Sequence, residues 1–380
     1  MTWPTNPGSR AKLTTGQRKL GEVAEIYQGG KSGLTKKDYV KSGFLAFSAT
    51  GQDGFTKKAF DSGFAVILSS IGARCGKCFY AEGKWTALAN TQVIKLDDPM
   101  AAKFLYYYLN DENKWPRYGS AQPFIAPSTV KRLKVPFPSL PIQKKIVERL
   151  DAIKKTQELN DKQLVLVEEL FQSLLHRELD PKGKNWEVKR LGELSLVITK
   201  GTTPTTYGYR FTDAGIPFLR VEDVNNDLVN PKKTEYHISK ETHEFMKRSK
   251  TEPRDILVTI AGTIGRVAHV PENAPEMNMN QAVAIVRLKP LVNHLYVFYL
   301  LRTKELQRAM KFAEVTGTIT NISLTTLKNL KIPLPPIETQ RKIVEKLSAV
   351  QEYKKKLLEQ KQKLQELFES VLNKSFKGAI

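Results

Sequence analysis

The segment Ile146-Val-Glu-Arg-Leu-Asp-Ala-Ile153 recurs 197 residues later as Ile343-Val-Glu-Lys-Leu-Ser-Ala-Val350. The match at this offset extends over residues 135–176 and 332–373. Upstream, Lys19-Leu-Gly-Glu-Val23 has a counterpart in Arg190-Leu-Gly-Glu-Leu194. A long self-match of this kind indicates an internal repeat, so we expect two copies of one plan, each a globular part followed by a helix.

Each matched segment has apolar residues at alternating spacings of four and three, the heptad pattern of a coiled coil. Prolines at 136, 138 and 141, and at 333, 335 and 336, prevent an earlier start of either helix. We therefore predict antiparallel helices near 143–177 and 340–376, each about 35 residues or roughly 50 Å long. The predicted seam residues are Ile146, Leu150, Ile153, Leu164, Val167 and Phe171 in the first helix, and Ile343, Leu347, Val350, Leu357, Leu364 and Phe368 in the second.

Polar residues interrupt this seam. Gln157 and Asn160 lie in the first helix, and Lys354 and Lys361 lie in the second. They are either solvated gaps in a weak coiled coil or polar contacts that set the register of two unlike helices. Antiparallel packing would place the two globular parts at opposite ends of a pseudo-twofold arrangement, which suits a target with its own approximate dyad, such as duplex DNA.

The globular parts contain β-like runs in matching places. Residues 65–69 and 92–96 are predicted strands of the first part, and residues 255–260 and 282–288 those of the second. One helix is expected in each part, near 100–110 and 291–312. The predicted fold class is α+β: two pseudo-repeated α/β domains separated by two long helices packed as an antiparallel coiled coil. The predicted domains are residues 1–141, 142–179, 180–336 and 337–380.

The charge balance points to a polyanionic partner. The chain has 60 basic and 39 acidic residues among 380, a net charge of +21. Nucleic acid is the first expectation and an acidic membrane surface the second. No apolar run reaches the roughly 18 residues of a membrane-spanning helix, and the first residues lack the apolar segment of a signal peptide. We therefore expect a cytoplasmic protein.

No motif in the sequence predicts catalysis. Cys75-Gly-Lys-Cys78 is a lone CxxC pair without a second pair of zinc ligands, and the corresponding Ile264-Gly-Arg-Val267 has no cysteine. Gly-x-Ser-x-Gly, HExxH, a phosphate loop and the Asn/Asp-Pro-Pro-Tyr/Phe motif of adenine methyltransferases are all missing. We expect neither a bound metal nor a cofactor, and any role of Cys75 and Cys78 stays open.

Polar and basic residues gather in glycine-rich turns at matching places of both globular parts. Lys and Arg can neutralise phosphates, whereas Arg, Gln, Asn and Ser can hydrogen-bond to base edges. The predicted DNA-binding residues of the first part are Lys31, Ser32, Gln52, Arg74, Lys77 and Gln122. Those of the second are Lys200, Thr202, Thr203, Arg220, Asn225, Arg266, Thr318 and Asn321.

The two helix entries, Pro138-Ser-Leu-Pro-Ile-Gln-Lys-Lys-Ile-Val147 and Pro335-Pro-Ile-Glu-Thr-Gln-Arg-Lys-Ile-Val344, resemble those of type I restriction-modification specificity subunits. The Leu-Gly-Glu motifs at 20–22 and 191–193 fit the same family, and the resemblance covers essentially the whole chain, from about Lys19 to Phe376. It implies two target recognition domains, 1–141 and 180–336, each reading half of a split DNA sequence, and a helical pair that sets their spacing. It also implies a non-catalytic subunit.

The resemblance further implies the partners. These are double-stranded DNA, methyltransferase subunits (two in the family's usual complex) that use S-adenosylmethionine, and restriction subunits that use ATP and Mg²⁺. Two alternatives stay open: a coiled-coil adaptor between proteins without sequence-specific DNA binding, and a DNA-modifying enzyme with a fused specificity module. The sequence does not reveal the target bases, the spacer length or the presence of a working restriction subunit.

Overall fold

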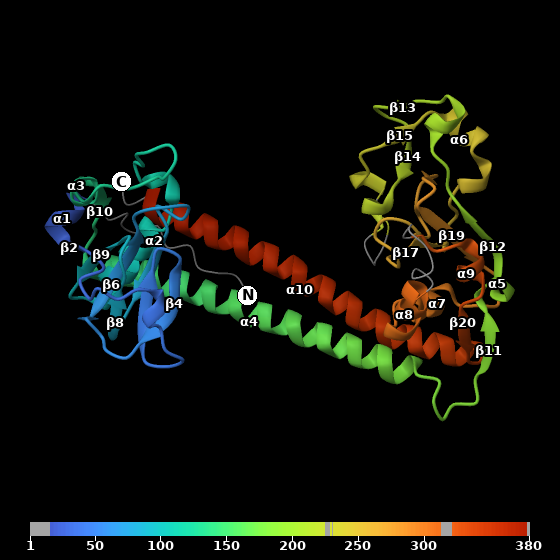
Figure 1. The fold of residues 1–380 in the computed structure, drawn as a ribbon, viewed down its shortest axis with the longest axis horizontal. Coiled ribbons are helices and arrows are strands. Elements are labelled where there is room, and N and C mark those ends of the chain that lie inside the picture. The colour runs from blue at the N-terminus through green and yellow to red at the C-terminus, as the bar shows by residue number, and fades with distance from the viewer. Residues whose placement is uncertain (1–15, 225–228, 230, 313–320, 378–380) are drawn as a thin grey trace, which may run out of the picture. The chain divides into compact units, whose positions relative to one another are not determined.

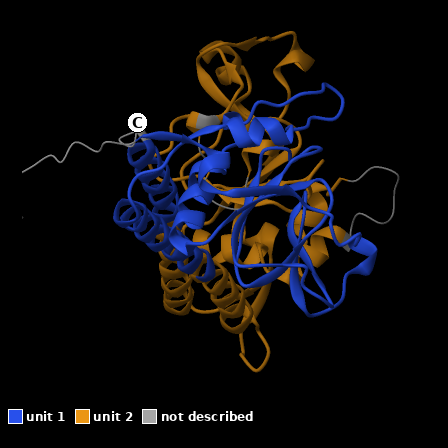
Figure 2. Ribbon diagram, turned by 90° about the vertical axis from the view of Figure 1, so that its left-hand side faces the viewer, with its two compact units in different colours: residues 1–162, 358–380 blue, residues 163–357 orange. Residues whose placement is uncertain are grey.

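The two heptad segments form the long helices α4 (Leu140–Leu179) and α10 (Ile337–Lys377) of this computed structural model (Figure 1). The structure describes residues 16–224, 229, 231–312 and 321–377. They fold as two compact units: unit 1 is Met1–Lys162 with Leu358–Ile380, and unit 2 is Gln163–Leu357 (Figure 2). Each unit therefore contains one globular part together with half of α4 and half of α10.

Glutamine side chains fix the start of both long helices. Gln143 Nε2 donates a hydrogen bond to the Pro138 carbonyl at 2.7 Å, and Gln340 Nε2 donates to the Pro335 carbonyl at 2.8 Å. These bonds occupy carbonyls of the proline-rich entries that have no helical partner. α4 ends at Leu179, where the Lys184 ammonium donates to the free carbonyls of Arg177 and Glu178.

Within unit 1, α4 and α10 pack antiparallel. Gln157 Nε2 donates to the Leu364 carbonyl at 3.3 Å, and the Lys361 ammonium lies 2.8 Å from Asp161. Residue numbers thus rise along α4, from Gln157 to Asp161, while those of their partners fall along α10, from Leu364 to Lys361. Two of the polar interruptions of the seam are therefore cross-helix contacts.

Unit 2 shows the same direction of packing. The Lys354 ammonium lies 2.6 Å from Glu168, and that of Lys346 lies 3.1 Å from Glu178. In both units these pairs favour the interpretation that polar seam residues set register. They are partly exposed, so each adds little to stability while excluding shifted registers.

Every predicted seam residue is shielded from solvent to some degree. Seven are buried: Ile146, Leu150, Val167, Phe171, Ile343, Leu347 and Leu357. Five are half-buried: Ile153, Leu164, Val350, Leu364 and Phe368. Asn160 is 2% exposed, so this polar position lies inside the seam.

A four-stranded antiparallel sheet forms the centre of unit 1, in the order β2-β9-β6-β7. One face packs on α2 and the long helices through Val66, Leu68 and Phe104. The other face meets a second sheet, β4-β3-β8-β5, through Ile67, Phe47 and Trp85. Because both faces are covered, the central strand β6 is a continuous apolar run instead of an alternating one. The elements are β1 (Gln17–Lys19), α1 (Leu20–Val23), β2 (Glu25–Gln28), η1 (Lys36–Asp38), β3 (Phe44–Ser48), β4 (Gly51–Thr56), β5 (Asp61–Ser62), β6 (Phe64–Ser69), β7 (Cys78–Ala81), β8 (Lys84–Ala87), β9 (Thr91–Leu96), α2 (Pro99–Leu109), η2 (Glu112–Lys114), α3 (Pro127–Arg132) and β10 (Lys134–Pro136), with β1 paired to β10.

Unit 2 repeats this plan. Its central sheet has the order β12-β19-β16-β17, the counterpart of the order in unit 1, and a second sheet has the order β13-β15-β14-β18. The elements are β11 (Glu187–Arg190), α5 (Leu191–Leu194), β12 (Ser195–Lys200), η3 (Pro204–Tyr207), β13 (Phe211–Thr212), β14 (Ile216–Leu219), η4 (Val221–Asp223), η5 (Pro231–Lys233), β15 (His237–Ile238), α6 (Lys240–Phe245), η6 (Lys247–Ser249), β16 (Ile256–Thr259), β17 (Val267–His269), β18 (Asn278–Met279), β19 (Val283–Leu288), α7 (His294–Leu301), α8 (Lys304–Phe312), α9 (Leu324–Lys328) and β20 (Lys331–Leu334), with β11 paired to β20. The predicted fold class is confirmed.

One predicted helix is divided in two. Residues 291–312 were expected to form a single helix, but α7 ends at Leu301 and α8 starts at Lys304. Thr303 Oγ1 donates to the Leu300 carbonyl at 2.7 Å and accepts a hydrogen bond from the Leu306 amide at 3.5 Å. A threonine that bonds to neighbouring backbone in this way favours a helix boundary over a helix interior.

The long helices α4 and α10 carry many charged side chains. Among the residues that the structure describes, no helix has both the length and the apolar character needed to cross a membrane.

Candidate nucleic-acid interface

The polar loops of unit 1 converge on one end of its central sheet. Gln28 at the end of β2 pairs with Gln92, and Ser69 at the end of β6 pairs with Thr91. The loops that follow β2 and β6 therefore leave the sheet at the same end. The first carries Lys31 and Ser32, and the second carries Arg74 and Lys77.

The loop containing Gln122 is attached to this end by backbone hydrogen bonds. The Gly72 amide donates to the Pro123 carbonyl and the Ile125 amide to the Ser70 carbonyl, both at 2.9 Å. Gln122 itself is exposed. The structure thus brings the predicted residues of three separate loops to one edge of unit 1.

The β3–β4 hairpin joins the same edge. Arg74 Nη1 donates a 2.7 Å hydrogen bond to the Thr50 carbonyl in the hairpin turn. Gln52, the second residue of β4, is exposed beside this turn. Arg74 uses one of its five N–H donors in this contact, so the guanidinium keeps donors for a ligand while being held in place.

The predicted lysines of unit 1 have different surroundings. The Lys31 ammonium lies 3.9 Å from the centre of the Tyr27 ring, a cation–π contact on an exposed turn. The Lys77 ammonium lies 3.6 Å from a Glu112 oxygen, and both side chains are partly exposed. Lys31 is therefore the freer of the two to neutralise a phosphate.

Unit 2 gathers its predicted residues in the equivalent place. Lys200 ends β12, and the following Gly201 and Thr202 bond to the backbone of Val283 and Met279. Thr203 Oγ1 donates to the Gln281 side chain. Asn321 forms a bridge with Ala261 in the loop after β16, and the neighbouring Ile322 amide donates to the Ile260 carbonyl at 2.8 Å, as Ile125 does to Ser70 in unit 1.

Arg266 and Arg220 come from two further segments of unit 2. Arg266 closes the turn before β17, where its backbone exchanges two hydrogen bonds with Thr259. Arg220 follows β14 and lies 4.6 Å from the centre of the Tyr236 ring and 3.2 Å from Glu222. Two further predicted residues, Asn225 and Thr318, lie outside the described residues.

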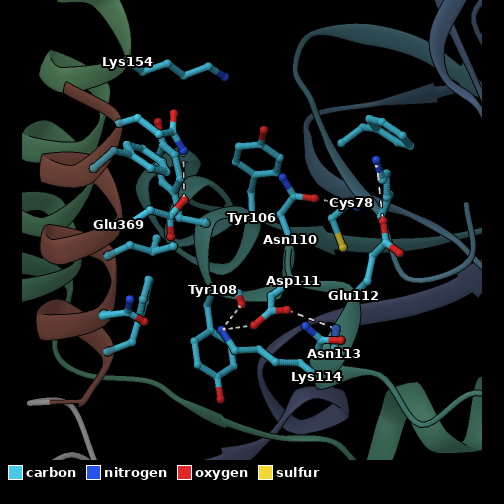
Figure 3. Close-up of a pocket in the computed structure, with 18 of the residues that line it drawn as sticks. Cys78, Tyr106, Tyr108, Asn110, Asp111, Glu112, Asn113, Lys114, Lys154 and Glu369 are labelled. Atoms are coloured by element: carbon cyan, nitrogen blue, oxygen red, sulfur yellow. Dashed lines mark hydrogen bonds and ion pairs between the residues drawn. The ribbon is translucent and has the colours of Figure 1, made fainter. Parts of the chain in front are cut away.

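A large pocket adjoins the interface in unit 1 (Figure 3). Its volume is about 1050 Å³, and its walls come from the end of α2, η2, and the unit 1 halves of α4 and α10, with Arg74 and Lys77 also in the lining. The Lys114 ammonium donates to the Tyr108 carbonyl at 2.8 Å and lies 3.7 Å from Asp111. Burial lowers the pKa of Lys114. Two of the lysines that line this pocket, Lys77 and Lys114, therefore already face carboxylates.

The two cysteines offer no reactive thiolate. Both are buried and unbridged, and their thiols donate to the carbonyls of Ser70 and Leu109. Burial raises the pKa of the Cys78 thiol far above its usual range. Such thiols are inert packing groups. Within the described ranges, no group of His, Cys, Asp and Glu side chains is arranged to hold a metal ion.

Comparison with known families gives a match that covers both repeats. The model of the type I restriction modification DNA specificity domain matches residues 14–169 and again residues 183–367. The chain belongs to this family. Its role is DNA sequence specificity, and the two matches correspond to the two copies found in the sequence.

Individual members of the specificity family agree with this assignment. The specificity subunit of the type I restriction enzyme EcoBI of Escherichia coli is 32% identical over 176 residues, which are 44% of this chain and 36% of that subunit. The EcoR124I/EcoR124II specificity subunit, also of Escherichia coli, is 24% identical over 86% of this chain and 84% of its own length. The crystal structure of a type I S subunit from M. genitalium has the same fold, with a TM-score of 0.65, 17% identity and 97% of each chain covered.

Asp53 of this specificity chain is absent from the residues predicted from the sequence, and so are the residues that bond to it. Asp53 lies beside the predicted Gln52 but is acidic, and an acidic side chain is not expected to contact a phosphate. A signal was present in the sequence, since Gly51-Gln-Asp-Gly54 places a carboxylate between two glycines, a composition typical of a turn.

Proposed function

We propose that this chain is the specificity subunit of a type I restriction-modification complex, in which unit 1 and unit 2 each read one half of a split DNA target. The observation that carries the proposal is the repeated loop system: both units gather polar loops at the same end of equivalent sheets. The loop residues differ: Arg266 of unit 2 takes the place of Lys77 in unit 1, and Asn321 takes the place of Phe124. Unlike side chains on a common frame read unlike bases.

We propose that the helical pair is the binding surface for the protein partners, which are methyltransferase subunits and restriction subunits. In the unit 2 part of α4, Val165, Leu166 and Leu170 are 59%, 62% and 49% exposed. Neighbouring exposed apolar side chains on a helix are typical of a protein contact surface. In this proposal the subunit itself catalyses nothing. S-adenosylmethionine, ATP and Mg²⁺ belong to the partners, and the complex acts on DNA in the cytoplasm.

The salt dependence of duplex binding tests the DNA part of this proposal. Replacing Lys31 by Ala should weaken binding to all sequences alike and flatten the slope of log affinity against log salt by about one unit. Lys77→Ala should have a smaller effect, because Glu112 already faces that ammonium. Gln52→Ala should instead relax discrimination at one base pair, by about 1–3 kcal/mol.

Lys144→Ala is the matched control. This exposed lysine of α4 carries the same charge and pairs only loosely with Glu148, at 3.9 Å. Its replacement should leave the salt slope unchanged. A chain that shows no salt-dependent duplex binding would instead be the coiled-coil adaptor, and lysine variants that all behave alike would refute the placement of the interface.

A further inference from the structure

The β3–β4 hairpin of unit 1 has an irregularity close to its turn. Ala46 pairs with Gly54 and Phe47 pairs with Gln52, so Asp53 is an extra residue without a partner in β3. A bulge of this kind bends a strand and redirects a side chain, and bulges are frequent next to functional sites. Here the redirected side chain is a carboxylate, only 25% exposed.

The Asp53 carboxylate collects hydrogen bonds from four side chains. Ser48 Oγ and Tyr39 OH each donate at 2.7 Å, and the Lys36 ammonium and Thr50 Oγ1 also donate. Asp53 thus ties η1, the strand end and the hairpin turn together. The hydrogen bonds of these donors hold the pKa of Asp53 well below its usual range, although partial burial opposes them, so the group is a carboxylate at neutral pH.

Two neighbouring contacts complete the arrangement. The Tyr39 ring covers Gly54 so closely that a Cβ at residue 54 would lie 2.1 Å from a ring carbon. On the other side of the turn, Arg74 donates to the Thr50 carbonyl. The turn of the β3–β4 hairpin, which lies next to both Gln52 and Arg74, is therefore fixed by an ion pair, several hydrogen bonds and a ring contact.

We propose that Asp53 is a positioning residue for base recognition: its carboxylate holds the hairpin turn in one conformation and so presents Gln52 and Arg74 together to base edges. This inference rests on the proposed function and deepens it. Gln and Arg are the side chains that form paired hydrogen bonds to adenine and guanine in the major groove. A binding loop that is rigid before binding avoids the entropy cost of ordering it on the DNA. Lys36 offsets the negative charge of Asp53, which would otherwise repel the nearby phosphates.

The test is selection of binding sites from a pool of random DNA duplexes by the full chain, comparing the natural protein with Asp53→Asn. The matched control is Asp38→Asn, which removes the same charge from an exposed carboxylate of η1 that bonds to Thr35 and not, among the described residues, to the hairpin turn. Asp53→Asn should lower the preference about tenfold at one or two adjacent base pairs of one half-site. The other half-site should keep its sequence, and binding to random duplex should not weaken, because no positive charge is lost.

Several outcomes would overturn the inference. Unchanged half-sites in Asp53→Asn would show that the carboxylate positions nothing, and an equal loss in Asp38→Asn would reduce the effect to charge alone. Loss of an entire half-site would indicate that unit 1 no longer folds in Asp53→Asn. The milder variant Tyr39→Phe then tests whether the Asp53 carboxylate has the positioning role. This variant keeps the ring on Gly54 and removes one hydrogen bond, so it should relax the same base pairs less strongly, and no relaxation would refute the role. A natural chain that selects no split site would instead overturn the proposed function, and this inference with it.

Discussion

Leu150 and Leu347 occupy equivalent positions of the repeat, and both side chains are 0% exposed. Leu150 packs in the core of unit 1, and Leu347 packs in that of unit 2. Replacing either by Ala removes three buried carbon atoms, worth about 2.4 kcal/mol at roughly 0.8 kcal/mol each. The cavity left behind adds to this loss, so we expect destabilisation of about 3–5 kcal/mol.

The repeat also provides matched controls. Leu170 and Leu367 are equivalent to each other, lie on the same two helices and are 49% and 48% exposed. Replacing them by Ala exposes little new surface and leaves no closed cavity, so we expect losses of about 1 kcal/mol or less.

Hydrogen exchange measured by mass spectrometry is the appropriate assay, because a chain of two units has no single free energy of unfolding. Leu150→Ala should speed exchange in β6 of unit 1, and Leu347→Ala in β19 of unit 2. A loss of about 3 kcal/mol corresponds to roughly 100-fold faster exchange through unfolding. Equal effects of the buried and exposed substitutions would refute the assignment of these leucines to the cores.

Asp255 is fully buried and accepts two hydrogen bonds from Arg287, at 2.9 and 2.8 Å. Asp255→Ala leaves the guanidinium without this buried partner, so it should destabilise unit 2 by about 3 kcal/mol, measured as faster hydrogen exchange in β16 and β19. Burial, together with nearby His269 and Arg254, lowers the pKa of His294 to about 4, whereas an unfolded histidine titrates near 6.5. Between these two pKa values the unfolded state binds more protons than the folded state. Stability should therefore fall as the pH drops from 6.5 to 4, by about 2 kcal/mol after allowance for solvent screening. In His294→Gln the melting temperature should depend less on pH over this range. Inserting seven residues, one heptad, into both long helices at equivalent positions should lengthen the unread spacer and leave both half-sites unchanged in methylome maps, and a constant spacer would contradict the role of the helices as its determinant.

The sequence by itself predicted the features that depend on local periodicity. The heptads of α4 and α10 could be recognised because every turn of a helix repeats the same geometric requirement. The central strands could be recognised because strands covered on both faces are uninterrupted apolar runs. The repeat offset then assigned equivalent roles to residues as distant as Leu150 and Leu347.

The sequence did not predict the partners that meet across the fold. The donors to Asp53 come from residues 36, 39, 48 and 50, and the turn is braced from residue 74. No period connects these positions, and a single bulge redirects the carboxylate toward them. The same holds for the pairing of Glu168 with Lys354, which requires a specific antiparallel register. Periodicity shows which face of an element is buried, but only the folded chain decides which polar groups meet. A hydrogen bond requires a donor–acceptor distance that is correct to within a few tenths of an ångström, and here the two residues are far apart in the sequence.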